Sequence, residues 1–309
     1  MKKLVLETTA PFQGLPELVA YDEGLFAKEG LQIEWADREA GVAKKIETNV
    51  TNAERREPFR EPRQVAGTGQ GRHVQRLRTG QLLPRSGNRP RQPAARPSRH
   101  RRLRGYHGAA DSPVYTPQQL ANRAVGVPFY FGTHYLALHL LEGFLPREMI
   151  KLCRAPNGSS YRFDAMMRGE LEATPLTEPY ITLAEKKGCR SVCSAFFHGT
   201  EVAERVDGET YAAFNRAVRE AVRRINANKK AYLHYFIDYY AARDPEIAAL
   251  KVEDLRESRL VVCDPTPIPL DEMQRTYDWL KSWRMLEETA SPLALVNLVV
   301  QNHAHQAAE

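Results

Sequence analysis

Strand-like and helix-like patterns alternate along two separate stretches of this chain, and that order constrains its fold most. In residues 1–50, the predicted strands are 3–8 and 31–35, and the predicted helices are 15–21 and 42–47. Such alternation is typical of a parallel sheet covered by helices. The pattern therefore predicts an α/β protein, and 309 residues are enough for one large or two ordinary domains.

The same alternation returns in residues 111–195. Its predicted strands are 124–128, 150–153, 171–174 and 190–194, and its predicted helices are 133–144, 161–168 and 180–187. Helices dominate the remaining chain. The clearest is 209–228, where apolar residues at helical spacing predict a core-facing stripe: Tyr211, Phe214, Val218, Val222 and Ile225. Two further packing helices are predicted at 232–240 and 271–283, the second with Trp279 and Trp283 as core residues.

Between the two stretches, residues 54–104 have neither a helical nor a strand period. This Arg-rich segment holds 15 Arg, no Lys, 3 acidic residues and six Pro. Its net charge is +12, whereas the whole chain carries +6, so the rest of the chain is acidic. The basic character therefore belongs to one segment, which is predicted to be irregular or disordered.

Three explanations of the Arg-rich segment compete. The first is a disordered arm that binds nucleic-acid phosphates, but such arms usually mix Lys with Arg, and Phe59 is the only aromatic residue for stacking. The second is a solvated linker, although about 50 residues is long for a loop. The third is out-of-frame translation of a GC-rich gene. We favour this frame shift and therefore expect no nucleic-acid partner. Sequencing codons 48–112 tests the frame shift.

Composition and motifs exclude several other classes. The four cysteines lack the paired spacing of a zinc site, which predicts reduced thiols and no metal. No phosphate loop, Ser-His-Asp set or paired catalytic carboxylates are recognisable, so no cofactor or catalytic residue is assigned. No apolar run of about 7–15 residues follows Lys2 and Lys3, so the chain as written is expected in the cytoplasm. It would be periplasmic if an export signal was lost upstream. No apolar run of about 18 residues predicts membrane insertion.

Two segments resemble a known family. Residues 20–31, Ala-Tyr-Asp-Glu-Gly-Leu-Phe-Ala-Lys-Glu-Gly-Leu, match the A-x-x-x-G-L-F-x-x-E-G-L signature of the SsuA/THI5-like (NMT1-like) group of type 2 periplasmic binding proteins. Residues 122–188 resemble the second lobe of that group, with Met-Arg-Gly-Glu-Leu-Glu-Ala at 167–173 and Thr-Glu-Pro-Tyr at 177–180. The resemblance covers residues 1–50 and about 111–300.

The resemblance implies an α/β fold of two lobes, with mixed sheets flanked by helices and crossover strands between the lobes. It divides the chain into a first part of lobe 1 at 1–110, lobe 2 at 111–195, and a C-terminal helical part at 196–309 that returns to lobe 1. The family's first lobe continues through residues 50–110 with helices and strands. Because the Arg-rich segment does not supply them, lobe 1 is expected to be disrupted.

Members of this family bind sulfonates, nitrate, bicarbonate, pyrimidines or related compounds for ABC importers. One branch makes the thiamin pyrimidine with a cysteine-rich motif, which this chain lacks. The resemblance thus implies a solute-binding protein that holds a small polar or anionic organic molecule in an interlobe cleft, with ABC-transporter membrane subunits as partners. The alternative is a cytoplasmic enzyme on the same fold, a decarboxylase or other lyase, or a relative of pyrimidine and thiamin biosynthesis.

Candidate ligand-binding residues lie at strand ends and helix N-termini, where free N–H groups favour anions. Gly132, Thr133, His134 and Tyr135 open the helix after the strand at 124–128, with Thr133 as the expected N-cap. The alternative at this position is a capped helix with an exposed His134.

Other candidates follow the remaining strands. Phe12, Gln13 and Leu15 come after the first strand, as a cleft wall or as turn and core. Arg38 follows the second strand, as a partner for a carboxylate or sulfonate or as a surface charge.

The last candidates are Asn157, after the strand at 150–153, and Glu178 and Tyr180, at the predicted crossover. Glu178 is predicted to hold a ligand amine or a helix N-terminus, or to pack at the hinge.

Overall fold

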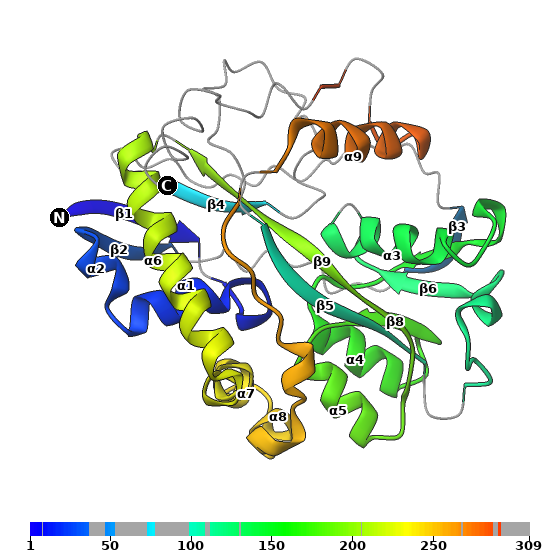
Figure 1. Cartoon of the computed structure of the whole chain (residues 1–309). Coiled ribbons are helices and arrows are strands. Elements are labelled where there is room, and N and C mark those ends of the chain that lie inside the picture. The colour runs from blue at the N-terminus through cyan, green and yellow to red at the C-terminus, as the bar shows by residue number, and fades with distance from the viewer. Residues whose placement is uncertain are drawn as a thin grey trace.

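A mixed sheet runs through the described part of the molecule. The computed structural model describes residues 1–7, 9–36, 47–52, 73–77, 99–108, 112–129, 131–204, 206–266, 268–286 and 290–291. Within these residues, nine strands are joined in the order β2-β1-β4-β9-β5-β8-β6-β7-β3. Helices lie on both faces of the sheet (Figure 1). The predicted α/β class is confirmed, and hydrogen bonding continues across both lobes.

Lobe 1 is built on β1 (Lys2–Glu7), which pairs in parallel with β2 (Leu31–Ala36) and β4 (His73–Leu77). Three helices pack against it: α1 (Pro11–Asp22), α2 (Leu25–Lys28) and α6 (Gly208–Ala227). The apolar stripe predicted for the helix at 209–228 is confirmed, because all five of its residues are buried in the core that α6 shares with α1.

Two glycines shape the motif at residues 20–31. Gly24 separates α1 from α2 with φ of 68°, and Gly30 turns the chain into β2 with φ of 73°. Both angles lie in the left-handed region, which glycine adopts without the steric cost of a Cβ atom. Between them, Phe26 stacks on Phe214 of α6, with ring centroids 5.4 Å apart. The motif therefore builds the α1–α2 corner and fixes it to α6.

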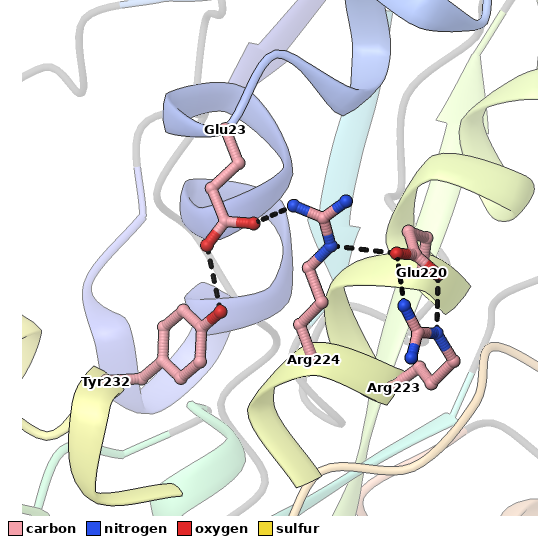
Figure 2. A network of polar contacts seen from close by, with 5 residues as sticks. All are labelled: Glu23, Glu220, Arg223, Arg224 and Tyr232. Carbon is pink, nitrogen blue, oxygen red and sulfur yellow. Dashed lines mark hydrogen bonds and ion pairs between the residues drawn. The ribbon is translucent and has the colours of Figure 1, made fainter. Parts of the chain in front are cut away.

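A polar network also joins the end of α1 to α6 (Figure 2). Glu23 accepts hydrogen bonds from Arg224 at 2.5 Å and from the Tyr232 hydroxyl at 2.9 Å. Glu220 in turn accepts from Arg224 at 2.8 Å and from Arg223 at 2.7 Å. Because these side chains are still partly exposed to solvent, the network orients the helices more than it stabilises them.

Lobe 2 contains β8 (Ala173–Leu176), β6 (Ala124–Val127), β7 (Lys151–Arg154) and β3 (Glu47–Asn52). Strand β6 is parallel to both β8 and β7, and β3 is antiparallel to β7. Residues 42–46 of one predicted helix lie outside the described residues, whereas Glu47 begins β3.

The lobe 2 helices lie on opposite faces of the sheet. Helix α3 (Gly132–Glu142) shares a core with Val125 and Leu152, whereas α4 (Ser159–Met167) and α5 (Tyr180–Lys186) share another with Cys153. Because neighbouring side chains of a strand point to opposite faces, Leu152 and Cys153 assign the two cores to the two sides.

Two long strands connect the lobes. β5 (Arg99–Gly108) and β9 (Arg190–Glu204) pair antiparallel from Arg99 opposite Thr200 to Gly108 opposite Arg190. β9 also pairs with β4, and β5 with β8, so these two are the crossover strands (Figure 1). The prediction that Glu178 and Tyr180 lie at a crossover is wrong, because the whole of α5 separates them from β9.

Two strands fall within residues 54–104, where the sequence pattern indicates none. They are β4 and the beginning of β5, and both pair with β9. The expectation of wholly irregular structure is therefore corrected at these residues, since pairing with a long neighbouring strand outweighs a weak local pattern. The other residues of the Arg-rich segment lie outside the described residues.

The C-terminal helices do not all return to lobe 1. α9 (Leu270–Ser282) packs on lobe 2, where Trp279 and Trp283 join the core of α3. Both indole N–H groups donate to Glu142 of α3, at 2.7 and 3.2 Å. The packing role of the two tryptophans is confirmed, but the assignment of 196–309 to lobe 1 is wrong for α9. Among the described helices, none is long and apolar enough to traverse a bilayer.

Candidate functional site

The carboxyl ends of β6, β7 and β8 meet at one edge of lobe 2. These strands are parallel neighbours, so the segments that follow them leave the sheet at the same edge. The chain leaves β6 for α3 on one face, and leaves β7 and β8 for α4 and α5 on the other. In α/β sheets, ligands bind at the carboxyl edge where the connections diverge in this way. Topology therefore places the candidate site beside the end of β6.

The N-terminus of α3 stands at this edge. Its N-cap is Phe131, in an extended conformation and without a side-chain cap, and the His134 N–H donates to the Phe131 carbonyl at 2.8 Å. The expectation that Thr133 is the N-cap is wrong, because Gly132 is already helical. Thr133, His134 and Tyr135 are all buried.

His134 is a buried titratable group at this edge. It is 1% exposed and lies against the Phe129 ring, with centroids 4.9 Å apart. Burial, with a smaller contribution from the positive charge of Arg154, lowers the pKa of His134 to about 3. The alternative of an exposed His134 is therefore wrong, and the imidazole is neutral at physiological pH.

Arg154 brings a cation to the end of β7. Its guanidinium carbon lies 5.3 Å from the centroid of the Phe129 ring, and the side chain is half-buried. Arg154 is absent from the sequence-predicted candidates. A usable signal was present, because a basic residue directly follows the apolar strand predicted at 150–153.

The N-terminus of α4 stands at the same edge of the sheet as that of α3. Asn157 is half-buried, and Gly158, with φ of 152°, is the N-cap. The Ser159 hydroxyl lies 2.9 Å from the Thr177 hydroxyl and accepts from the Thr177 N–H at 3.2 Å. The loops after β7 and β8 are thereby joined, which brings Asn157 and Glu178 to the same edge.

Glu178 is already engaged by protein groups. One carboxylate oxygen accepts from the Thr182 N–H at 3.1 Å, and the other from Arg259 at 2.9 Å. Glu178 thus binds the first turn of α5, one of the roles predicted for it. Burial raises its pKa, although Arg259 acts in the opposite direction.

Tyr180 is equally engaged, since its hydroxyl donates to Asp244 at 2.8 Å. Asp244 precedes α8 (Pro245–Ala248), and Arg259 ends a short 3-10 turn. Glu178 and Tyr180 therefore fix α5 to the segment 244–259.

The lobe 1 candidates lie where β1 leads into α1. Gln13 and Leu15 are buried, and Phe12 packs half-buried against the same core. Gly14 has a non-helical conformation, which kinks α1 before Pro16. Arg38 lies outside the described residues.

Together, these features suit an anion. Two helix N-termini direct backbone N–H groups and positive dipole ends toward the same edge, where Arg154 adds a full positive charge. The thiols nearby are poor nucleophiles, because burial raises the pKa of Cys153 to about 11 and that of Cys193 to about 12. Among the described residues, no group of His, Cys, Asp and Glu could hold a metal ion.

Comparison with known proteins gives matches to solved structures. No family model and no curated protein matches the chain. The alkanesulfonate-binding protein SsuA from Xanthomonas axonopodis pv. citri, bound to MOPS, has a TM-score of 0.65 at 11% identity, over 96% of this chain and 97% of that one. The desulfurization enzyme DSZB has a TM-score of 0.60 at 13% identity, over 100% of both chains. A mutant of that enzyme was solved in complex with biphenyl-2-sulfinic acid.

A third match is the ligand-binding component of an ABC-type import system from Staphylococcus aureus, solved with zinc bound. It has a TM-score of 0.58 at 12% identity, over 98% of both chains. The chain therefore has the fold of the periplasmic binding proteins. Within this fold, its structure is similar to those of the sulfonate-binding SsuA proteins, as the motif at residues 20–31 indicates.

Proposed function

We propose that this chain is a solute-binding protein of the SsuA-like type, and that its ligand is a small organic anion of the sulfonate or sulfinate class. One observation carries the proposal: the N-termini of α3 and α4 follow the adjacent parallel strands β6 and β7, with Arg154 at the end of β7. A tetrahedral or pyramidal oxyanion accepts several N–H bonds at once, which suits two helix ends and a guanidinium.

In this proposal, each candidate residue has a role. The backbone at Gly132, Thr133, His134 and Tyr135 and the amide of Asn157 bind the oxyanion. Phe12, Gln13 and Leu15 form the facing wall from lobe 1, and Arg38 supplies a second cation. Glu178 and Tyr180 support the site through α5, since their polar atoms bind Arg259 and Asp244.

A transport role is part of the same proposal. Structural matches include components of import systems as well as sulfonate binders. We propose that the loaded protein delivers its ligand to the membrane subunits of an ABC importer, which requires export to the periplasm.

Ligand binding is expected to raise the melting temperature. At a ligand concentration of 100 times Kd, binding to the native state alone contributes about 2.7 kcal/mol, which corresponds to about 5 °C for a chain of this size. Differential scanning fluorimetry with alkanesulfonates, MOPS and biphenyl-2-sulfinate measures the shift, with primary alcohols of equal chain length as uncharged controls. Equal melting temperatures with and without every sulfonate and sulfinate would contradict the proposal.

Replacing Arg154 with Met is expected to weaken sulfonate binding by about 10- to 100-fold, because a hydrogen bond to a charged group contributes about 1.5–3 kcal/mol. Isothermal titration calorimetry measures Kd. The matched control is Arg168→Met at the end of α4, where the guanidinium pairs with Glu170 at 2.6 Å and is 57% exposed. Unchanged affinity in Arg154→Met, or an equal loss in the control, would remove Arg154 from the site.

The enzyme alternative is supported by the match to DSZB over the full length of both chains. Incubating each stabilising compound with the protein and analysing the mixture by mass spectrometry distinguishes the two functions. Intact ligand after many hours favours the binding protein, whereas released sulfite or carbon dioxide favours a lyase or desulfinase.

A further inference from the structure

A buried arginine lies directly behind the candidate site. Arg162, in the first turns of α4, is 3% exposed. Its Nη1 donates to the Pro156 carbonyl at 2.9 Å. Its Nε and Nη2 both donate to the Pro175 carbonyl, at 3.1 and 2.9 Å. One side chain therefore holds the loop that follows β7 and the end of β8.

The two carbonyls lie where the neighbouring strand β6 offers few donors. On that side of β8, the described ladder pairs Ala173 with Val125, and Pro175, which faces Tyr106 of β5 on the other side, lies beyond this pair. Pro156 lies two residues after the end of β7. The planar guanidinium presents five donors in a fixed fork, so it can bind both carbonyls at a set separation. A lysine has one nitrogen and cannot reproduce that fork.

The contacts of Arg162 with the Pro156 and Pro175 carbonyls form a clamp, and this clamp fixes the residues that face the site. Asn157 and Gly158 directly follow Pro156, and Thr177 lies two residues after Pro175. The Ser159 hydroxyl, 3.4 Å from Nη2 of Arg162, binds Thr177 in turn. Arg162 therefore sets where the N-terminal amides of α4 stand relative to the end of β8.

The charge of Arg162 acts in the same direction. A guanidinium stays protonated throughout the physiological range, and low dielectric surroundings screen it weakly. It lies behind the N-terminus of α4, so its field adds to that of the helix dipole. An anion at the edge is attracted by both, whereas an uncharged ligand of the same shape gains little from either.

We propose that Arg162 is a positioning residue of this site, and that through Arg162 the site selects anionic over uncharged ligands. This inference rests on the proposed function. It assigns the selectivity to a side chain that lies behind the loops rather than at the ligand.

The test compares two probes, 1-propanesulfonate and the uncharged 1-propanesulfonamide, by calorimetry. We expect Arg162→Lys to weaken sulfonate binding about 10-fold and Arg162→Met about 100-fold, with less than about 3-fold loss for the sulfonamide. Arg168→Met on the same helix is the control and should leave both affinities unchanged. Equal losses for the two probes, or wild-type sulfonate affinity in both variants, would overturn the proposal.

Hydrogen exchange separates this inference from the proposed function. Faster amide exchange at residues 157–160 is expected in Arg162→Lys and faster still in Arg162→Met. If the wild-type protein binds neither probe, the proposed function fails, and unchanged exchange at these amides would also refute the clamp. If Arg162→Met does not fold, the Lys variant decides, since it keeps the charge and loses the fork.

Discussion

Replacing Arg259 with Met is expected to lower the free energy of unfolding by about 3–5 kcal/mol, the usual cost of removing one partner of a buried ion pair. The Arg259 and Glu178 side chains are only 13% and 10% exposed, and their charged atoms lie 2.9 Å apart. Arg259 also pairs with Glu185 of α5. Without the guanidinium, two carboxylates face each other in a largely dry site. Urea unfolding at pH 7 measures the loss.

The pH dependence of this loss has a defined sign. Burial already raises the pKa of Glu178 above its unfolded value, and removing Arg259 raises it further. Stability linked to a raised carboxyl pKa is retained below the unfolded pKa of about 4.3 and lost as the pH rises through the folded one. The gap between wild type and variant is therefore expected to narrow toward pH 4.

Arg256→Met is the matched control for Arg259→Met. Arg256 approaches the same Glu185 at 3.5 Å, but its side chain is 65% exposed. Exposed pairs contribute about 0–1 kcal/mol, so this variant should be nearly as stable as the wild type. An equal decrease in the free energy of unfolding of both variants would show that the buried ion pair stabilises the protein no more than the exposed one.

The polar contacts between α5 and the segment that contains Arg259 also join the lobes. Tyr180, Lys186 and Glu178 bind Asp244, Asp254 and Arg259, respectively, which fixes α5 of lobe 2 to the segment 244–259. The same segment follows α7 (His234–Ala241), which contacts α1 of lobe 1. In Figure 1, α7 and α8 lie between α6 and α5. This connection supplements the crossover strands β5 and β9.

Local patterns predicted the elements whose own residues determine them. The amphipathic stripe of α6 and the punctuating glycines Gly24 and Gly30 act within a few residues of the chain, so spacing alone indicates their structure. The second half of β9 was missed because its pairing with β4 and β5 comes from distant residues. The placement of α9 likewise depends on Glu142, which receives both indole N–H groups.

The candidate site was predictable to the level of strand ends. The rule that ligands approach helix N-termini led to Gly132–Tyr135 and Asn157, and topology brings these segments to one edge. Arg154 and Arg162 escaped because a basic residue in the sequence is most often a surface charge. The place of Arg154 directly after the predicted strand 150–153 is a usable signal in the sequence, whereas only the fold shows that Arg162 is buried against two carbonyls.

His134 is expected to make stability fall as the pH drops from about 6.5 toward 3. In the folded protein its pKa is lowered to about 3, whereas in the unfolded chain it titrates near about 6.5. Between these pH values the unfolded state binds a proton that the native state does not bind. The free energy of unfolding therefore decreases by about 1.4 kcal/mol for each unit by which the pH falls. His134→Gln removes this titration, and the wild type should lose about 3 kcal/mol more than the variant between pH 6.5 and 4.

Urea unfolding of both proteins across that range measures the difference in slope, which does not depend on how much the substitution itself destabilises the fold. His234→Gln is the control, since this exposed histidine pairs with Asp238 on the surface of α7. Parallel pH curves for wild type and His134→Gln would show that the imidazole accepts a proton in place. With a saturating sulfonate, the wild-type protein should lose less free energy of unfolding between pH 6.5 and 4. The reason is that an anion beside Arg154 offsets the positive charge that disfavours protonation of His134.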